Sequence, residues 1–282
     1  MKNILSRRFD AGAVAVTAAI AALLGAIFGA LMMLLNFDSG IDYFKPNALT
    51  VIFIIFCVGV ILWLVLAARV TRTDKLTFDP CAERRAEGVL SIISAVVALA
   101  IGVILFVVYF KERGTVTLLG AVFAVLAAFY YLSLFTKERR LTPSKNILAL
   151  SGFATVLWYI LLVVYMYLDV FVTMNSPVKT LLIFALVAAM LATLSDVRYV
   201  IGRGLPRYSL AVNGINLFLG CTAFVSTLAC HIVSPISDVH YLLAALASLS
   251  AAAVSGVRLY SVAHGAQDPD EPTSIDTEEK GS

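Results

Sequence analysis

The sequence predicts an all-α membrane protein with eight transmembrane helices and both termini in the cytoplasm. Hydrophobic residues make up 61% of the 282 residues and charged residues only 14%, against about 45–50% and 25% in soluble domains. The mean hydropathy is +0.94. The apolar residues form long continuous runs without alternation, which indicates helices that pair their own backbone amides in lipid.

Each apolar run is close to or above the roughly 20 helical residues that cross a hydrocarbon core of about 30 Å. None of the runs carries a charged residue near its middle. The predicted spans are residues 11–36, 48–68, 88–110, 115–136, 147–168, 178–196, 208–230 and 240–261. Together they make one transmembrane domain, residues 1–264.

The basic residues are distributed unequally between the two sides of the predicted bundle. Seventeen of the 21 Lys and Arg residues fall near the termini or in alternate connections, and the other four are Lys45, Lys111, Arg113 and Lys179. Cytoplasmic loops hold the excess of basic residues. We therefore expect both termini to be cytoplasmic, in a plasma membrane or a bacterial inner membrane.

The composition changes abruptly after Ala263. Residues 265–282 are rich in Asp and Glu and contain almost no apolar side chains. Such a segment cannot bury enough surface to fold, so it predicts a disordered acidic cytoplasmic tail. A solvated terminus is the simpler interpretation, and docking to a partner protein is the alternative.

A weak internal similarity relates residues 11–140 to residues 147–264. A shift of 131 residues superimposes identical residues, which are Asp38, Pro46, Ile52, Phe53 and Arg72 on Asp169, Pro177, Ile183, Phe184 and Arg203. Four helices per half would give a 4+4 parallel repeat, as in some transporters. The alternative is coincidence, because these residue types are common at helix ends and in apolar sequence.

Two predicted helices carry small residues at four-residue spacing. These residues are Ala21, Gly25 and Gly29 in the first span, and Ala244, Ser248, Ala252 and Gly256 in the last. Small residues at this period let two helix backbones approach closely in lipid. We expect both stripes to pack inside the chain, and a homo-oligomer interface is the alternative.

Motifs for catalysis and for metal or cofactor binding are absent from the sequence. It contains no HExxH, CxxC or Gly-rich phosphate loop, and each of these would signal a specific chemistry. His231 and His240 flank a short external loop, where we expect them to be solvated. We predict no catalytic residue, cofactor, metal or nucleic-acid partner.

Four charged residues lie near the predicted cytoplasmic ends of their helices. They are Asp196, Arg198 and Arg258 at the ends of the sixth and eighth spans, and Glu87 at the start of the third. We expect the long side chains to reach the interface, and a negative charge is favourable at the start of a helix. A pump that couples to ions through membrane carboxylates is then disfavoured.

The uncharged polar residues concentrate in the seventh span, where Asn213 and Asn216 need partners inside the bundle. If the last three helices are neighbours, these residues form one cluster with Asp196, Arg198 and Arg258. The cluster is either a ligand site or a set of hydrogen bonds that locks the helices together.

Trp158 and Tyr159 lie near the middle of the fifth span. A buried tyrosine hydroxyl needs a hydrogen-bond partner, and aromatic walls suit an amphipathic ligand. Packing in the core or against lipid is the simpler interpretation of this pair.

Three functions fit the sequence. The first is a transporter or permease-like component for a small uncharged or lipid-like solute. The second is a non-catalytic membrane subunit or scaffold that binds a membrane or cytoplasmic protein. The third is a lipid-modifying enzyme that acts through Glu87, Asp196 and nearby arginines. Membrane lipids are the expected partners in every case.

Overall fold

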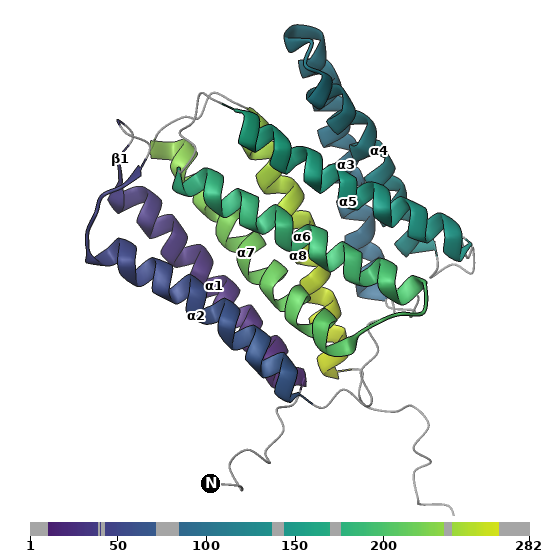
Figure 1. The fold of residues 1–282 in the computed structure, drawn as a ribbon, viewed down its shortest axis with the longest axis horizontal. Helices are drawn as coiled ribbons and strands as arrows, with labels where there is room; N and C mark the ends of the chain where they lie inside the picture. The colour runs from purple at the N-terminus through teal and green to yellow at the C-terminus, as the bar shows by residue number, and fades with distance from the viewer. Residues whose placement is uncertain are drawn as a thin grey trace, which may run out of the picture.

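The protein is seen here in a computed structural model, which describes residues 11–38, 40, 43–71, 85–136, 144–169, 176–233 and 239–264. Within these ranges the chain forms eight helices (Figure 1), namely α1 (Ala11–Asn36), α2 (Ala48–Val70), α3 (Arg85–Glu112), α4 (Thr115–Thr136), α5 (Lys145–Leu168), α6 (Pro177–Val200), α7 (Pro206–Val233) and α8 (Val239–His264). Each is long and apolar enough to cross a membrane. The predicted class, an all-α membrane protein with eight spans, is confirmed.

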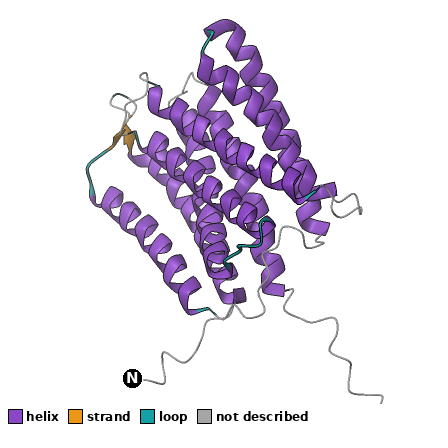
Figure 2. Ribbon diagram, turned by 45° about the vertical axis from the view of Figure 1, so that its right-hand side comes forward, coloured by secondary structure: helices purple, strands orange, loops and turns teal. Residues whose placement is uncertain are grey.

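Predicted and observed helix ends differ by four residues at most, and the largest difference is at the end of α6. A two-stranded antiparallel ribbon between α1 and α2 was not predicted (Figure 2). Its strands are β1 (Phe37–Asp38) and β2 (Tyr43–Phe44). The Asn36 side chain fixes this connection, because it donates to Thr50 Oγ1 at 2.7 Å and accepts from Asn47 Nδ2 at 2.5 Å.

Helix α7 lies at the centre of the bundle and packs against α1, α2, α6 and α8. Helices α1 and α2 form one edge, and the α3–α4 hairpin forms the other, where α4 packs on α5 and α3 on α8 (Figure 1). Helix α2 is the most peripheral, since only Phe53, Leu64, Ala67 and Ala68 are buried along it. Its remaining apolar surface is suited to contact with lipid.

Helix α1 begins and α8 ends at the same end of the bundle, which we call the terminal end (Figure 1). The β ribbon marks the opposite end. Which end faces the cytoplasm stays a prediction. The acidic tail and the basic residues at 72–84 and 137–143 lie outside the described residues.

Both stripes of small residues face α7, as predicted for packing inside the chain. A methyl group added at Gly25 of α1 would overlap Thr222 and Phe218 of α7. On the other side of α7, Gly220 approaches Ser248 and Ala252 of α8. The absence of side-chain bulk therefore sets the distance between α7 and its two neighbours.

The two proposed halves pack differently. Helix α1 lies along α7, whereas α5, its counterpart in a 4+4 repeat, packs against α4 and α6. The duplication is not confirmed and stays a prediction.

Gly25→Ala is expected to lower the free energy of unfolding by about 1–3 kcal/mol, because overpacking forces α1 away from α7. The thermal unfolding midpoint in detergent measures this loss. Gly59→Ala is the matched control, since nothing lies within 4 Å of an added methyl at that position in α2. Equal midpoints for the two variants would contradict the assigned contact.

Candidate functional site

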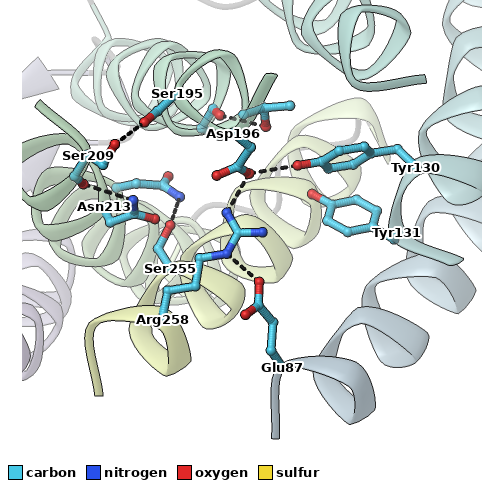
Figure 3. Close-up of polar contacts among 12 residues, drawn as sticks. Glu87, Tyr130, Tyr131, Ser195, Asp196, Ser209, Asn213, Ser255 and Arg258 are labelled. Atoms are coloured by element: carbon cyan, nitrogen blue, oxygen red, sulfur yellow. Dashed lines mark hydrogen bonds and ion pairs between the residues drawn. The ribbon is translucent and has the colours of Figure 1, made fainter. Parts of the chain in front are cut away.

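An arginine joins two carboxylates from distant parts of the chain (Figure 3). Arg258 of α8 donates from Nε to Oε1 of Glu87 in α3 at 2.5 Å, and its Nη1 pairs with Oδ2 of Asp196 in α6. All three residues lie within about 3 to 9 Å of the helix ends at the terminal end, given the helical rise of about 1.5 Å per residue. They therefore lie near one boundary of the apolar region.

The expectation that the side chains of Asp196 and Arg258 reach the membrane interface is wrong. Arg258 is 2% exposed, and Asp196 and Glu87 are each 5% exposed. Their helix faces point toward neighbouring helices, and burying a charge costs several kcal/mol unless it is paired. The position of these groups near the helix ends agrees with the sequence prediction. Their burial removes the expected contact with solvent, which was one of the two reasons to disfavour coupling through membrane carboxylates.

Two tyrosine contacts join α4 to its neighbours, and the first of them extends this network. Tyr130 donates from its hydroxyl to Oδ2 of Asp196 at 2.6 Å. The hydroxyls of Tyr131 and Tyr159 lie 2.7 Å apart. The hydrogen-bonded network of Arg258 thus involves α3, α4, α6 and α8, and the Tyr131–Tyr159 pair joins α4 to α5 beside it.

The aromatic pair of α5 is packed in the core rather than against lipid. Trp158 and Tyr159 are fully buried, with ring centroids 5.2 Å apart. Among the described residues, Trp158 Nε1 has no hydrogen-bond partner. Neither residue lines the cavity described next, so the ligand site proposed for this pair does not coincide with the charged centre.

A small cavity lies beside the Asp196–Arg258 pair. Its volume is about 10 Å³, which is near the minimum needed for one water molecule. Its wall combines small apolar residues of α6 and α8 with polar side chains, which are Tyr130, Tyr131, Thr193, Asp196, Asn216, Ser255 and Arg258. The site is thus a polar pocket that joins α4, α6, α7 and α8.

Three of the five residues predicted to cluster meet at this cavity, namely Asp196, Asn216 and Arg258. Asn216 donates to Ser255 Oγ at 2.9 Å. Asn213 is not in the wall, and its amide donates to the Ser209 carbonyl one turn earlier in α7, at 2.8 Å (Figure 3). Arg198 is also outside, with its guanidinium 5.7 Å from the centre of the Tyr208 ring.

Tyr130, Thr193 and Ser255 were not predicted at this site, nor was the pairing of Glu87 with Arg258. The contact between Asp196 and Arg258 is the part of the site that the sequence indicated. Asp196 and Arg258 have opposite charges at similar distances from the ends of their helices, which predicts a pair if the helices are adjacent. Nothing in the sequence indicated which tyrosine or serine completes the wall.

A second polar group lies at the opposite end of the bundle. Lys179 is fully buried and donates to the Asp169 carbonyl at 2.7 Å, and Tyr241 donates to Asp169 Oδ2 at 2.7 Å. His240 is 1% exposed and stacks on Tyr165 at 3.7 Å. The expectation that His240 is solvated is therefore wrong, because the start of α8 packs against the end of α5.

No group of three or more His, Cys, Asp or Glu side chains within the described ranges is placed to hold a metal ion. No protein-family model matches this chain, and no curated protein or solved structure shows significant similarity to it.

Arg258→Gln is expected to destabilise the protein by about 3–5 kcal/mol, because it leaves Asp196 buried without its cation. Thermal or denaturant unfolding in detergent gives the size of the loss. Asp196→Asn in the same chain should restore part of it. Arg198→Gln serves as control, with an expected loss below about 1 kcal/mol, and a loss for Arg258→Gln no larger than that of this control would be incompatible with a paired centre.

Proposed function

We propose that the protein is a transport component of the membrane, a carrier or permease, and that its solute site is the cavity beside Asp196 and Arg258. One observation supports the proposal, namely a water-sized cavity that is lined by polar and ionisable side chains and lies inside the helix bundle. Polar and ionisable residues inside a membrane are costly, and they commonly mark the path of a solute or an ion.

The chemistry of the wall favours a small, polar and uncharged solute. Asp196 and Arg258 pair with each other, so their charges offset and select neither an anion nor a cation. Within the described chain, Nη2 of Arg258 and Oδ1 of Asn216 have no hydrogen-bond partner. A solute that both accepts and donates hydrogen bonds satisfies both atoms. A lipid-like solute is disfavoured by the volume of about 10 Å³.

The proposal also includes the membrane in which the protein resides and the side on which the charged centre lies. With the excess of Lys and Arg on the side of the termini, the charged centre lies near the cytoplasmic face of a plasma or bacterial inner membrane.

The alternative is a non-catalytic subunit in which the charged centre only holds the helices together. The observation that favours it is that Glu87, Asp196 and Arg258 join helices that are distant in sequence. The enzyme hypothesis has less support, because Glu87 and Asp196 face the interior of the bundle rather than a lipid headgroup.

The transport proposal is tested by osmotic swelling of proteoliposomes with water, urea and glycerol as probes. Asn216→Leu should slow permeation of the transported probe roughly tenfold or more, because it removes a polar group of the wall and leaves Ser255 without its donor. Asn213→Leu is the matched control, as a buried amide of the same helix outside the cavity. It should retain permeation.

Wild-type vesicles that swell no faster than protein-free vesicles with any of the three probes would count against the proposal. Equal permeation in the Asn213 and Asn216 variants would remove the cavity as the site. Both variants are first compared with the wild type in thermal unfolding, so that a folding defect is not mistaken for lost transport.

A further inference from the structure

The hydrogen bonds to Asp196 are concentrated on one of its two carboxylate oxygens. Tyr130 and Arg258 both contact Oδ2 (Figure 3). Among the described residues, Oδ1 accepts no hydrogen bond. A carboxylate in this arrangement has one oxygen that is fixed and one that is available to a proton.

Arg258 contacts Glu87 through a different nitrogen from the one that contacts Asp196. Its Nε holds Glu87, and its Nη1 holds Asp196. If Asp196 takes up a proton, Arg258 still has an anionic partner. The centre can therefore change its charge by one unit without leaving a buried guanidinium unpaired, which is the arrangement that costs most.

Asp196 is also part of the cavity wall. Two further buried atoms in that wall, Nη2 of Arg258 and Oδ1 of Asn216, have no partner within the described chain. Arg258 is 2% exposed, and Asn216 is fully buried. These unsatisfied atoms point to a ligand beside the carboxylate, and a water molecule there would carry protons to and from Oδ1.

We infer that Asp196 binds and releases a proton, and that this proton is exchanged in step with the solute in the cavity. A hydronium ion transfers a proton to Oδ1, which leaves water and a neutral carboxylic acid. No group is oxidised or reduced. The proton-binding part concerns Asp196 alone, whereas the coupling rests on the proposed transport function.

Protonation changes what the cavity offers to a solute. The neutral acid holds Arg258 Nη1 less strongly than the carboxylate does, because a charge-assisted hydrogen bond becomes an ordinary one. The guanidinium is then more available to a hydrogen-bond acceptor in the cavity. Solute binding and proton binding favour each other to the same degree, because linkage is reciprocal.

The groups that face Asp196 come from every helix packed around the centre. Their titratable and charged members are Glu87 on α3, Tyr130 and Tyr131 on α4, Tyr159 on α5 and Arg258 on α8. Helix α7 contributes the uncharged amide of Asn216 to the same wall. Of the two carboxylates at this centre, Asp196 lines the cavity and Glu87 does not.

Proton binding is tested by infrared difference spectroscopy on the full chain in nanodiscs, with acidification as the trigger. Acidification also protonates the other aspartates of the chain, so the signal of Asp196 is the wild-type spectrum minus the Asp196→Asn spectrum. We expect this difference to contain one carboxylic acid C=O band that shifts when aspartate carries a carbon-13 carboxyl. Asp169→Asn is the matched control, since Asp169 is a buried aspartate at the opposite end of the bundle, and it should keep the band.

The inference is overturned if the wild-type and Asp196→Asn spectra contain the same aspartate-sensitive bands. The Asp169→Asn spectrum shows whether the loss of any buried aspartate removes such a band. Asp196→Glu should retain a carboxylic acid band that no longer responds to aspartate labelling.

Coupling is tested in proteoliposomes that enclose a fluorescent pH indicator. An inward gradient of urea or glycerol, whichever crosses in the swelling assay, should change the internal pH in the wild type and not in Asp196→Asn. A labelled band without solute permeation would support proton binding and refute transport. Solute permeation without the band would support transport and refute this inference, and permeation without a pH change would refute the coupling.

Discussion

The contact of Arg258 with Glu87 and Asp196 is the interaction on which the rest of the bundle depends. It joins α3, α6 and α8, and Tyr130 adds α4 through the same oxygen of Asp196. These helices are separated by long stretches of sequence, and lipid provides no hydrophobic drive to bring them together. Directional polar contacts favour the association of these helices instead. The small residues of α1, α7 and α8 allow the helices to pack closely.

Polar groups also define the two boundaries of the apolar interior. Helices α6 and α8 run in the same direction (Figure 1), and each contributes a residue near its start to the polar group at one end of the bundle and a residue near its end to the charged centre at the other. In α6 these are Lys179 and Asp196, and in α8 they are Tyr241 and Arg258. The spacing is seventeen residues in both helices, or about 25 Å along the axis. This separation is close to the hydrocarbon thickness of about 30 Å, so the buried charges avoid the bilayer centre.

The sequence predicts the spans well because their length and apolar composition are fixed by the bilayer. It predicts the face of each helix poorly, because lipid and protein interior are both apolar and the helix shows little contrast between its sides. The position of Asp196 and Arg258 along their helices could therefore be predicted from the sequence, while their burial could not. Asn213 and Asn216 show the same limit, since they are three residues apart and only about 60° apart around α7, yet only Asn216 lines the cavity.

The ion pair is both a support of the fold and part of the cavity wall, and these two roles oppose each other. Under the proposed transport function, a solute larger than water requires the helices around the cavity to move apart, and a movement of α6 away from α8 separates Asp196 from Arg258. Separating two buried charges is costly. The cost is smaller if Asp196 has become neutral, because Arg258 then stays paired with Glu87 through Nε. In the proposed cycle, a second carboxylate on the same arginine thus keeps Arg258 paired while Asp196 is neutral.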